Sequence, residues 1–391
     1  MASDRMKIAI LCPDFPPDHT GLADHTATLA EHLVAHAEVT VITSQRGVRD
    51  EATGAVRVWR QVSQWGGRGG RTVGRLLLQL QPDWLIVQYV PHMYGRGGIN
   101  LMLPLLLLWW RQRGGHILLL IHELYLPWSL RPKRILAAMI QRLMLALSVA
   151  AARRVGVSTD VWRQRLERVF PFWRSRFHHL PTPSNVPVAH LTEAEKATVR
   201  KQLGLTWDEL VLGFFGTLHD SKLMDYVLES LRAVEADGQR ARLLCIGPTS
   251  QELAQAVNGV SHAPEERIVC TGYVDARCVS QYLSVTDIFL LPLIDGVSSR
   301  RSSLMAALSH RLPVVATIGE GTDHLLHESA AFARSPVEEQ SAFLENVCAL
   351  AADEARRRQL AEAGARLYQD QFSWPVVAAR LLSLLESKDR P

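Results

Sequence analysis

Short apolar runs alternate with longer segments of helical periodicity from the beginning of the chain. The pattern predicts a helix over Ala23–Ala37 and a flexible loop over Gly66–Gly70. The apolar runs predict five strands: Met6–Cys12, Glu38–Thr43, Val56–Val62, Trp84–Tyr89 and Ile117–His122. Apolar strands separated by helices are typical of a parallel sheet covered on both faces. We therefore expect the first half to form one doubly wound domain.

The segment Pro181–Pro187 interrupts this alternation, because its three prolines exclude regular structure and indicate a linker. After it the pattern begins again. Strands are predicted at Val211–Gly216, Arg242–Ile246, Ile268–Cys270, Asp287–Pro292 and Pro313–Thr317. Helices are predicted at Ser221–Glu235, Ala276–Ser284, Ser302–Arg311, Val337–Ala352, Glu354–Gln371 and Trp374–Ser387. We expect an N-terminal domain over 1–182, a linker over 183–195, a C-terminal domain over 196–372 and a last helix within 373–391. Ligands should bind at the carboxyl ends of the strands, in a cleft between the two domains.

Composition narrows the class of protein. Of 391 residues, 47% are hydrophobic and 21% are charged, which excludes a disordered or collagen-like chain. Five scattered cysteines without a Cys-x-x-Cys pair argue against a disulfide framework or structural zinc and favour a reducing cytoplasm. No signal peptide is expected at Met6–Cys12. The most apolar run, Ile99–Trp110, is too short to span a bilayer and predicts a buried helix, so we expect no transmembrane segment.

Charge is distributed unevenly along the chain. Residues 1–190 carry 23 Lys and Arg against 12 Asp and Glu, a net +11, whereas residues 191–391 carry 20 against 27, a net −7. Between Arg131 and Arg176 the basic residues are interleaved with aromatic ones such as Trp162 and Trp173, and Trp128 lies just before this segment. This mixture fits an anionic membrane surface, and it equally fits a solvated helical face with core aromatics.

Several motifs of nucleotide chemistry are absent from the sequence. It contains no Gly-x-Gly-x-x-Gly, no Walker lysine loop and no Asp-x-Asp. These absences argue against hydride transfer and phosphoryl transfer.

Four strand ends carry candidate chemistry. The proline-rich turn Pro16–Ala23 contains Gly21 ahead of a helix, where backbone N–H groups can face an anion, although a plain tight turn explains it as well. His122 ends a predicted strand, where ligands commonly bind. It could contact a ligand there, or it could have only a structural role. Gly216 permits close backbone approach, and Lys222 can meet a phosphate. Arg300–Ser303 brings two arginines and a helix start together, which favours a diphosphate site over a serine cap with solvated arginines.

The order of these motifs resembles family 4 retaining glycosyltransferases. The resemblance rests on six colinear segments: Pro16-Pro17…Gly21, Ile121-His122-Glu123, Pro183–Pro187, Phe215-Gly216…Ser221-Lys222, Gly272-Tyr273-Val274 and Leu312–Thr317. It implies the GT-B fold, with two Rossmann-like domains facing a cleft. The nucleotide sugar would bind the C-terminal domain and the acceptor the N-terminal one, and the last helix would cross back to the first domain.

The chain also departs from the pattern of that family. Thr217 stands near the place of the usual arginine, and Leu223 follows Lys222 in place of glycine. The two family glutamates, eight residues apart, fall on Ser298 and Ala306. Asp295 is the nearest carboxylate able to substitute, in a divergent Asp-Gly-Val-Ser-x-Arg-Arg motif where Arg300 or Arg301 could replace the missing arginine.

The resemblance implies a hexosyl-type transferase that moves a sugar from a nucleotide diphosphate sugar to a hydroxyl acceptor, with retention and without metal or other cofactor. The expected catalytic residues are His122, Lys222 and Arg301. The expected donor-binding residues are Gly21, Gly216, Thr217, Tyr273, Val274, Asp295, Ser298, Arg300, Ser302 and Ser303. The alternatives are a non-catalytic nucleotide-sugar-binding or scaffold protein and a nucleotide-sugar 2-epimerase. The acceptor is expected to be lipid-linked or a polysaccharide, met by a cytoplasmic protein at the inner membrane face, with no nucleic-acid partner.

Overall fold

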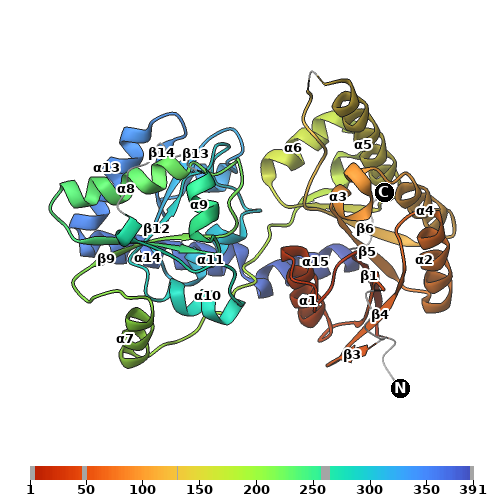
Figure 1. Cartoon of the computed structure of the whole chain (residues 1–391). Helices are drawn as coiled ribbons and strands as arrows, with labels where there is room; N and C mark the ends of the chain where they lie inside the picture. Colours follow the sequence, from red (N-terminus) through yellow and green to blue (C-terminus); the bar gives the residue numbers. More distant parts are fainter. Residues whose placement is uncertain (1–4, 46–50, 130, 257–264, 388–391) are drawn as a thin grey trace. The chain divides into compact units, whose positions relative to one another are not determined.

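The chain folds into two compact units (Figure 1). The computed structural model describes residues 5–45, 51–129, 131–256 and 265–387. Unit 1 comprises Met1–Pro181 and Val377–Pro391, and unit 2 comprises Thr182–Val376. The last helix, α15 (Trp374–Glu386), therefore begins in unit 2 and ends in unit 1.

In its described residues, unit 1 is built on an eight-stranded sheet in the order β3-β4-β2-β1-β5-β6-β7-β8. Its pairs are parallel except β3 with β4. The strands are β1 (Lys7–Leu11), β2 (Glu38–Ser44), β3 (Glu51–Thr53), β4 (Val56–Val62), β5 (Trp84–Tyr89), β6 (His116–Ile121), β7 (Arg154–Val157) and β8 (Phe177–His179). Since β2 and β5 flank β1 on opposite sides, the chain reverses direction across the sheet next to β1.

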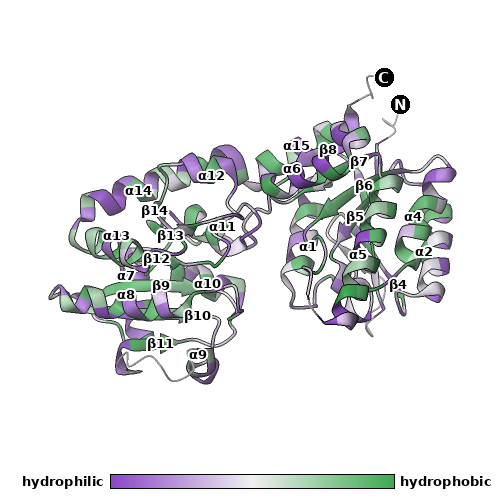
Figure 2. Cartoon of the chain, turned by 90° about the horizontal axis from the view of Figure 1, so that it is seen from above, coloured by the Kyte–Doolittle hydropathy of each residue, from purple (hydrophilic) through white to green (hydrophobic). Residues whose placement is uncertain are grey.

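Helices cover both faces of this sheet. One layer contains α2 (Gly67–Leu80), α4 (Met102–Gln112) and α5 (Pro132–Ala151), and the opposite face carries α1 (Gly21–Leu33) and the C-terminal part of α15 (Figures 1 and 2). The remaining helical segments of unit 1 are α3 (Pro91–Tyr94), η1 (Arg96–Gly98), α6 (Asp160–Val169) and η2 (Pro171–Arg176).

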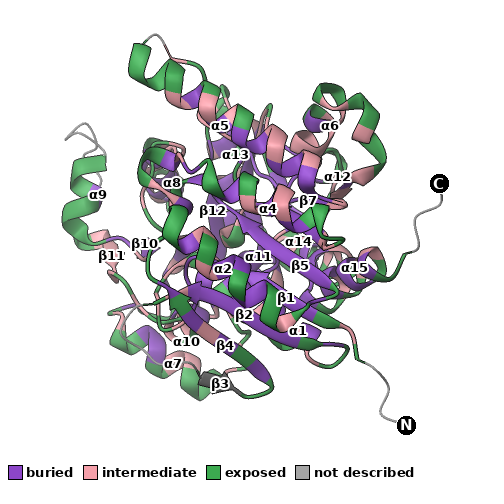
Figure 3. Cartoon of the chain, turned by 90° about the vertical axis from the view of Figure 1, so that its right-hand side faces the viewer, coloured by how far each residue is buried: buried purple, intermediate pink, exposed green. Residues whose placement is uncertain are grey.

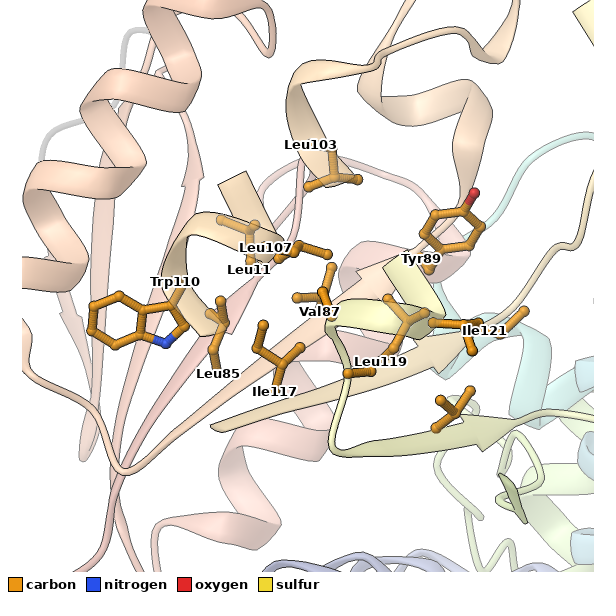
Figure 4. Close-up of a cluster of buried hydrophobic side chains, with 14 of the residues drawn as sticks. Leu11, Leu85, Val87, Tyr89, Leu103, Leu107, Trp110, Ile117, Leu119 and Ile121 are labelled. Atoms are coloured by element: carbon orange, nitrogen blue, oxygen red, sulfur yellow. The ribbon is translucent and has the colours of Figure 1, made fainter. Parts of the chain in front are cut away.

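Alternate strand residues fill the core beneath the α2–α4–α5 layer. Leu85 and Val87 of β5 and Leu119 of β6 are completely buried and belong to the same cluster as Leu107 of α4 (Figure 4). Burial of each such side chain contributes about 1.5–3 kcal/mol. Gln88 lies between Val87 and Tyr89, so its side chain points to the opposite face, toward α1.

The expectation of a flexible loop at Gly66–Gly70 is wrong, because helix α2 begins at Gly67. Its inner residues, among them Val73 and Leu77, are buried in the core and hold the helix despite four glycines. One of these glycines is required by packing: a Cβ on Gly69 would lie 1.8 Å from the Gln64 carbonyl oxygen. Packing of an apolar face overrides low intrinsic helix propensity here.

The expectation of a buried helix at Ile99–Trp110 is only partly correct. Helix α4 spans Met102–Gln112, and one face is buried through Leu103, Leu107 and Trp110. Met102 and Leu105, by contrast, are 40% and 48% exposed. The structure also adds strands β7 and β8, which are short and have few apolar residues.

Within its described residues, unit 2 has six parallel strands in the order β11-β10-β9-β12-β13-β14. They are β9 (Leu210–Phe215), β10 (Ala241–Ile246), β11 (Ile268–Cys270), β12 (Ile288–Leu291), β13 (Val314–Ile318) and β14 (Ala333–Pro336). The helical segments are α7 (Glu193–Gln202), α8 (Met224–Ala236), α9 (Ser250–Ala256), η3 (Glu265–Arg267), α10 (Ala276–Leu283), α11 (Ser302–Ser309), α12 (His324–Glu328), α13 (Gln340–Ala352), α14 (Glu354–Leu367) and η4 (Tyr368–Phe372). Two buried clusters, one on each face of the sheet, form its core.

Helix α5 alone among the described helices is long and apolar enough to cross a membrane, with a mean hydropathy of 1.5 over an 18-residue window. Its C-terminal half packs into the core through Met144, Leu145 and Val149. Its first turns are exposed and extend beyond the neighbouring helices (Figures 1 and 3). The helix is therefore partly a core element of unit 1.

Candidate functional site in unit 2

The candidate anion site of unit 2 lies where its sheet changes direction. Strands β9 and β12 are adjacent although β10 and β11 come between them in the chain. The connection after β9 and the connection after β12 therefore meet at the carboxyl edge of the sheet. Open α/β sheets bind their ligands at such a switch point.

Two glycines shape the backbone at this edge. Gly216 follows β9 with φ +111°, and Gly247 follows β10 with φ +110°, values that side-chain-bearing residues rarely adopt. A Cβ on Gly247 would lie 3.4 Å from the Gly216 carbonyl group, and one on Gly216 would lie 2.9 Å from the Lys222 Nζ. The amide of Gly216 donates to the Ile246 carbonyl oxygen at 3.0 Å. The glycines thus let two strand ends and a lysine approach closely.

Lys222 is held at the centre of this edge. Its backbone pairs with Leu293 in the connection after β12, and its Nζ donates to the Phe215 carbonyl oxygen at 3.3 Å. The ammonium also lies 4.4 Å from the centre of the Phe214 ring. Burial, followed by the positive charge of Arg301, lowers the pKa of Lys222 to about 8. An anion bound there would relieve this unfavourable charge pair.

The connection after β12 brings two arginines to one carboxylate. Asp295 accepts hydrogen bonds from Arg301 Nη2 at 2.6 Å and from Arg300 Nη2 at 3.3 Å. Its backbone oxygen accepts from the Gly321 amide at 2.8 Å. Asp295, Arg300, Arg301 and Lys222 together carry a formal charge of +2. The carboxylate orients the guanidinium groups without cancelling the positive charge of the site.

The serines after Asp295 differ in their surroundings. Ser298 is buried, and its Oγ has no hydrogen-bond partner among the described residues. Ser302 and Ser303 form the first turn of α11, whose N-cap residue, Arg301, makes no side-chain capping bond. The positive end of the α11 dipole therefore lies beside the two arginines, an arrangement that favours an anion.

Tyr273 and Val274 lie further along the same edge, after β11. The ring of Tyr273 is 73% exposed, whereas Val274 packs against the unit 2 core. Gly272, with φ +65°, donates its amide to the Pro248 carbonyl oxygen at 2.9 Å. Two strands, β10 and β9, separate this exposed ring from the arginines.

A cavity of about 520 Å³ opens beside Lys222. Besides Lys222 and Thr217 it is lined by Leu218, His219, Asp220, Leu223, Met224, Asp225, Gly247, Pro248, Glu252, Gln255 and Ala256. Its volume lies within the range of about 300–1,000 Å³ that is usual for small-molecule sites. Thr217 and Lys222 are the expected site residues that line it. In the described part of the chain, no three His, Cys, Asp or Glu side chains are grouped as metal ligands.

In unit 1, the site residue His122 contacts two polar residues that the sequence reading missed. His122 Nε2 lies 2.6 Å from Gln88 Oε1, and the rings of His122 and His25 meet edge to face at 4.9 Å. Because an amide oxygen only accepts, Nε2 carries the proton and Nδ1 keeps its lone pair. Burial lowers the pKa of His122 to about 4, and burial together with His122 lowers that of His25. The imidazole is neutral at physiological pH.

Gly21 begins α1, one turn before His25. Thr20 caps the helix by accepting a hydrogen bond from the Ala23 amide at 3.1 Å. A Cβ on Gly21 would meet no atom within 4 Å. Packing inside unit 1 therefore does not require glycine here.

The structure thus separates the expected residues into two groups. Unit 2 brings together Gly216, Lys222, Asp295, Arg300 and Arg301, with the serines of 298–303 beside them. Unit 1 holds His122 and Gly21 near His25 and Gln88. Two signals could have revealed the missed pair: an amide within the apolar strand Trp84–Tyr89, and a histidine on the apolar face of Gly21–Leu33.

Comparison with known proteins bears on unit 2 first. Residues 209–353 match the family model "Glycosyl transferases group 1". A curated relative from Corynebacterium glutamicum is 25% identical over 266 residues, covering 63% of this chain and 67% of that protein. It is named GDP-mannose-dependent monoacylated alpha-(1-6)-phosphatidylinositol monomannoside mannosyltransferase.

Solved structures resemble almost the whole chain. Sucrose-phosphate synthase from Thermosynechococcus elongatus superimposes with a TM-score of 0.69 at 18% identity, covering 97% of this chain and 98% of that one. Anabaena Alr3699/HepE in complex with UDP and glucose gives 0.70 at 14% identity, covering 98% of this chain and 100% of that one. The chain has the GT-B fold. The expectation of two Rossmann-like parallel-sheet domains is thereby confirmed.

Proposed function

We propose that this protein is a glycosyltransferase that moves a hexose-like sugar from a nucleotide diphosphate sugar to a hydroxyl acceptor. The observation that carries the proposal is the group formed by Lys222, Arg300 and Arg301 beside the α11 N-terminus, at the switch point of unit 2. The family match of residues 209–353 covers this group and supports the same reading.

The chemistry required of such a site is charge stabilisation. As the bond between the anomeric carbon and the diphosphate oxygen breaks, negative charge grows on the diphosphate. The acceptor oxygen bonds to that carbon, and its proton passes to the departing diphosphate. Lys222 and Arg301 would face this growing charge, and Gly216 would let the backbone approach the phosphates. Positive groups that are already in place stabilise the charge of the transition state and so lower the activation free energy of the transfer, because they need no rearrangement during the reaction.

The reaction is proposed to retain the anomeric configuration and to need no metal ion or other cofactor. The motif order of the sequence supports this proposal, and two arginines, a lysine and a helix dipole supply the positive charge that a metal ion would otherwise bring. His122, with its neutral ring and free Nδ1 lone pair, is proposed to accept a hydrogen bond from a sugar hydroxyl. Thr217, Tyr273, Val274, Ser298, Ser302 and Ser303 are proposed as donor contacts.

A turnover assay with a panel of donors tests this function. We expect release of nucleoside diphosphate from one donor of a panel that includes GDP-mannose and UDP-glucose, dependent on added membrane glycolipid extract and unaffected by a chelator. NMR of the anomeric proton in the product reports retention. Release of free sugar nucleotide epimer without acceptor would instead identify an epimerase.

A second candidate is a binding protein without transferase activity. Asp295, the carboxylate nearest in sequence to the missing glutamate at Ser298, is paired with both arginines. Asp323 accepts a hydrogen bond from the Ser299 amide at 2.6 Å. Both carboxylates are therefore engaged within the protein, which disfavours a contact of either with the donor sugar. The Lys222→Ala/Arg301→Ala variant separates the candidates. A transferase loses turnover by several orders of magnitude, whereas unchanged slow donor breakdown in this variant would favour the binding protein.

We further propose a lipid-linked or growing polysaccharide acceptor at the cytoplasmic face of the membrane. The name of the Corynebacterium relative, which acts on a phosphatidylinositol mannoside, supports a glycolipid. So does the exposed start of α5, where Arg131, Lys133 and Arg134 precede Leu136, which is 59% exposed. By contrast, Arg163 is paired with Asp160 and Glu167 inside unit 1.

Co-sedimentation with vesicles tests the membrane proposal. Each basic residue near an anionic leaflet contributes about 1 kcal/mol, so three at the start of α5 should bind reversibly at low salt and detach at high salt. We expect neutralisation of Arg131, Lys133 and Arg134 together to weaken binding more than tenfold. If the triple variant binds vesicles as tightly as the wild type, the start of α5 is not the membrane contact.

A further inference from the structure

An apolar groove runs between helices α2 and α4 on the outer surface of unit 1. It has a volume of about 490 Å³ and lies outside every residue assigned above to sugar transfer. One wall is formed by apolar side chains of α4, namely Met102, Leu105, Leu106 and Trp109, and Leu78 of α2 lies on the other wall. Leu78 and Leu105 are 47% and 48% exposed. These apolar side chains are gathered in one hollow instead of being scattered over the surface.

The glycines of α2 create the groove. Gly67, Gly70 and Gly74 lie on one face of the helix and form the other wall. At Gly74 a Cβ would lie 3.5 Å from the Trp109 ring, so the helices are closely packed at that end. At Gly70 a Cβ would meet nothing within 4 Å, so the groove is open there. A Cβ fits at both positions, but a larger side chain would meet the Trp109 ring at Gly74 and open space at Gly70.

Positive charge borders the groove. Arg71 and Arg75 line it, and Arg68 is exposed on the same helix. None of the three guanidinium groups has an acidic partner within the described parts of the chain. The sequence from 52 to 159 holds 14 Lys and Arg against two acidic residues, Asp83 and Glu123. The lining therefore suits a ligand that combines an apolar chain with a negative charge.

We propose that the groove binds an acyl chain of an anionic phospholipid, with the phosphate on Arg71 and Arg75. This inference rests on the membrane association proposed above and names the lipid contact. Helices α2, α4 and α5 form one layer (Figure 2), and α4 packs against both of the others. On α5, Leu136 and Met139 are 59% and 55% exposed. They follow the basic segment Arg131–Arg134 in the sequence. A second copy docked face to face would set arginine against arginine, which disfavours a symmetric dimer here.

Calorimetry with a monomeric lipid tests the proposal on the full chain. The probe is lysophosphatidylglycerol kept below its critical micelle concentration, with lysophosphatidylcholine as the uncharged-headgroup control. We expect the anionic lipid to bind more tightly than the zwitterionic one. Replacing Arg71 and Arg75 by alanine should weaken its binding by roughly 25-fold, about fivefold for each arginine. The matched control, Arg165→Ala/Arg168→Ala on α6, removes two exposed charges elsewhere in unit 1 and should change nothing.

A groove-filling substitution gives the sharper test. Gly70→Leu puts a Cβ where no atom lies within 4 Å, and it replaces a glycine at the fourth position of α2 by a strong helix former. The substitution should therefore raise the melting temperature. The same substitution should weaken lysophosphatidylglycerol binding by more than tenfold. Misfolding therefore cannot account for the expected loss of binding.

The remaining outcomes contradict the proposal in distinct ways. If wild-type protein binds anionic vesicles but no lysolipid, or if Gly70→Leu binds lysolipid normally, the groove is not the lipid site, although membrane association stands. If neither vesicles nor lysolipid bind, both ideas are wrong. If light scattering shows a dimer that Gly70→Leu dissociates, the groove joins two copies of the chain.

Discussion

The imidazole of His122 is neutral because burial lowers its pKa to about 4. Its Nε2 proton is donated to the Gln88 amide oxygen 2.6 Å away. A neutral ring cannot act as a strong acid at physiological pH, yet its Nδ1 lone pair can accept a hydrogen bond from a hydroxyl group. Gln88 thereby sets which nitrogen faces a ligand. We regard it as a positioning residue.

Changing Gln88 should change the protonation of His122 in a known direction. Gln88→Glu places a carboxylate against Nε2, which stabilises the imidazolium ion, so the pKa of His122 should rise from about 4 toward or above its ordinary value of 6.5. Gln88→Leu removes the acceptor and should leave the pKa low. NMR titration of the histidine ring protons measures this shift. Equal pKa values in both variants would contradict the assigned contact.

The lysine of unit 2 predicts a pH dependence for anion binding. The pKa of Lys222 is lowered from 10.5 to about 8, so its ammonium is charged at pH 7 and mostly neutral at pH 9. If only the charged form binds, diphosphate affinity should fall by about tenfold between these pH values. Lys222→Arg keeps its charge and should remove most of this dependence. An equally steep profile in that variant would assign it to another group.

Helix α2 shows how packing can define an element that local sequence hides. Its four glycines suggest a loop, but Gly69 and Gly74 occupy places where a neighbouring group leaves no room for a large side chain. The central strands β1, β5 and β6, by contrast, could be predicted because both of their faces are buried and their apolar runs are continuous.

Two substitutions in α2 should change stability in opposite directions. Gly70→Ala enters open space and should raise the free energy of unfolding by about 0.5–1 kcal/mol, because alanine favours helix over glycine. Gly74→Leu should lower it by about 1–3 kcal/mol, since the side chain would overlap the Trp109 ring. Urea denaturation measures both. A stabilising Gly74→Leu would contradict the observed helix packing.

The candidate site shows the same division between local and long-range information. Lys222 and Arg300–Arg301 could be predicted because each follows a strand and precedes a helix. The ion pairs of Asp295 and the contact of His25 with His122 could not, since they depend on how loops fold back and which strands become neighbours. Two features of the sequence hinted at these contacts: Asp295 stands close to Arg300 and Arg301, and Gln88 is a polar residue within an apolar strand.

At the scale of the whole molecule, the chain returns from unit 2 to complete unit 1. The indole of Trp84 donates to the Leu385 carbonyl oxygen at 3.1 Å, and Val377, Leu381 and Leu385 of α15 are buried. Truncation after residue 376 should expose this apolar face and destabilise unit 1 more than unit 2. Hydrogen exchange resolved by peptide should show faster exchange in β1 and β5 than in β9 and β10. If amide exchange accelerates equally in both units, the end of α15 does not stabilise unit 1 in particular.

Direct binding of nucleoside diphosphates is the measurement that tests the central claim most closely. Calorimetric titration of the full chain with UDP, GDP, ADP and TDP should show binding of at least one of them. The Lys222→Ala/Arg301→Ala variant should weaken that binding by more than tenfold, whereas Arg165→Ala/Arg168→Ala should leave it unchanged. Folded protein that binds none of the four diphosphates would contradict the proposed donor site.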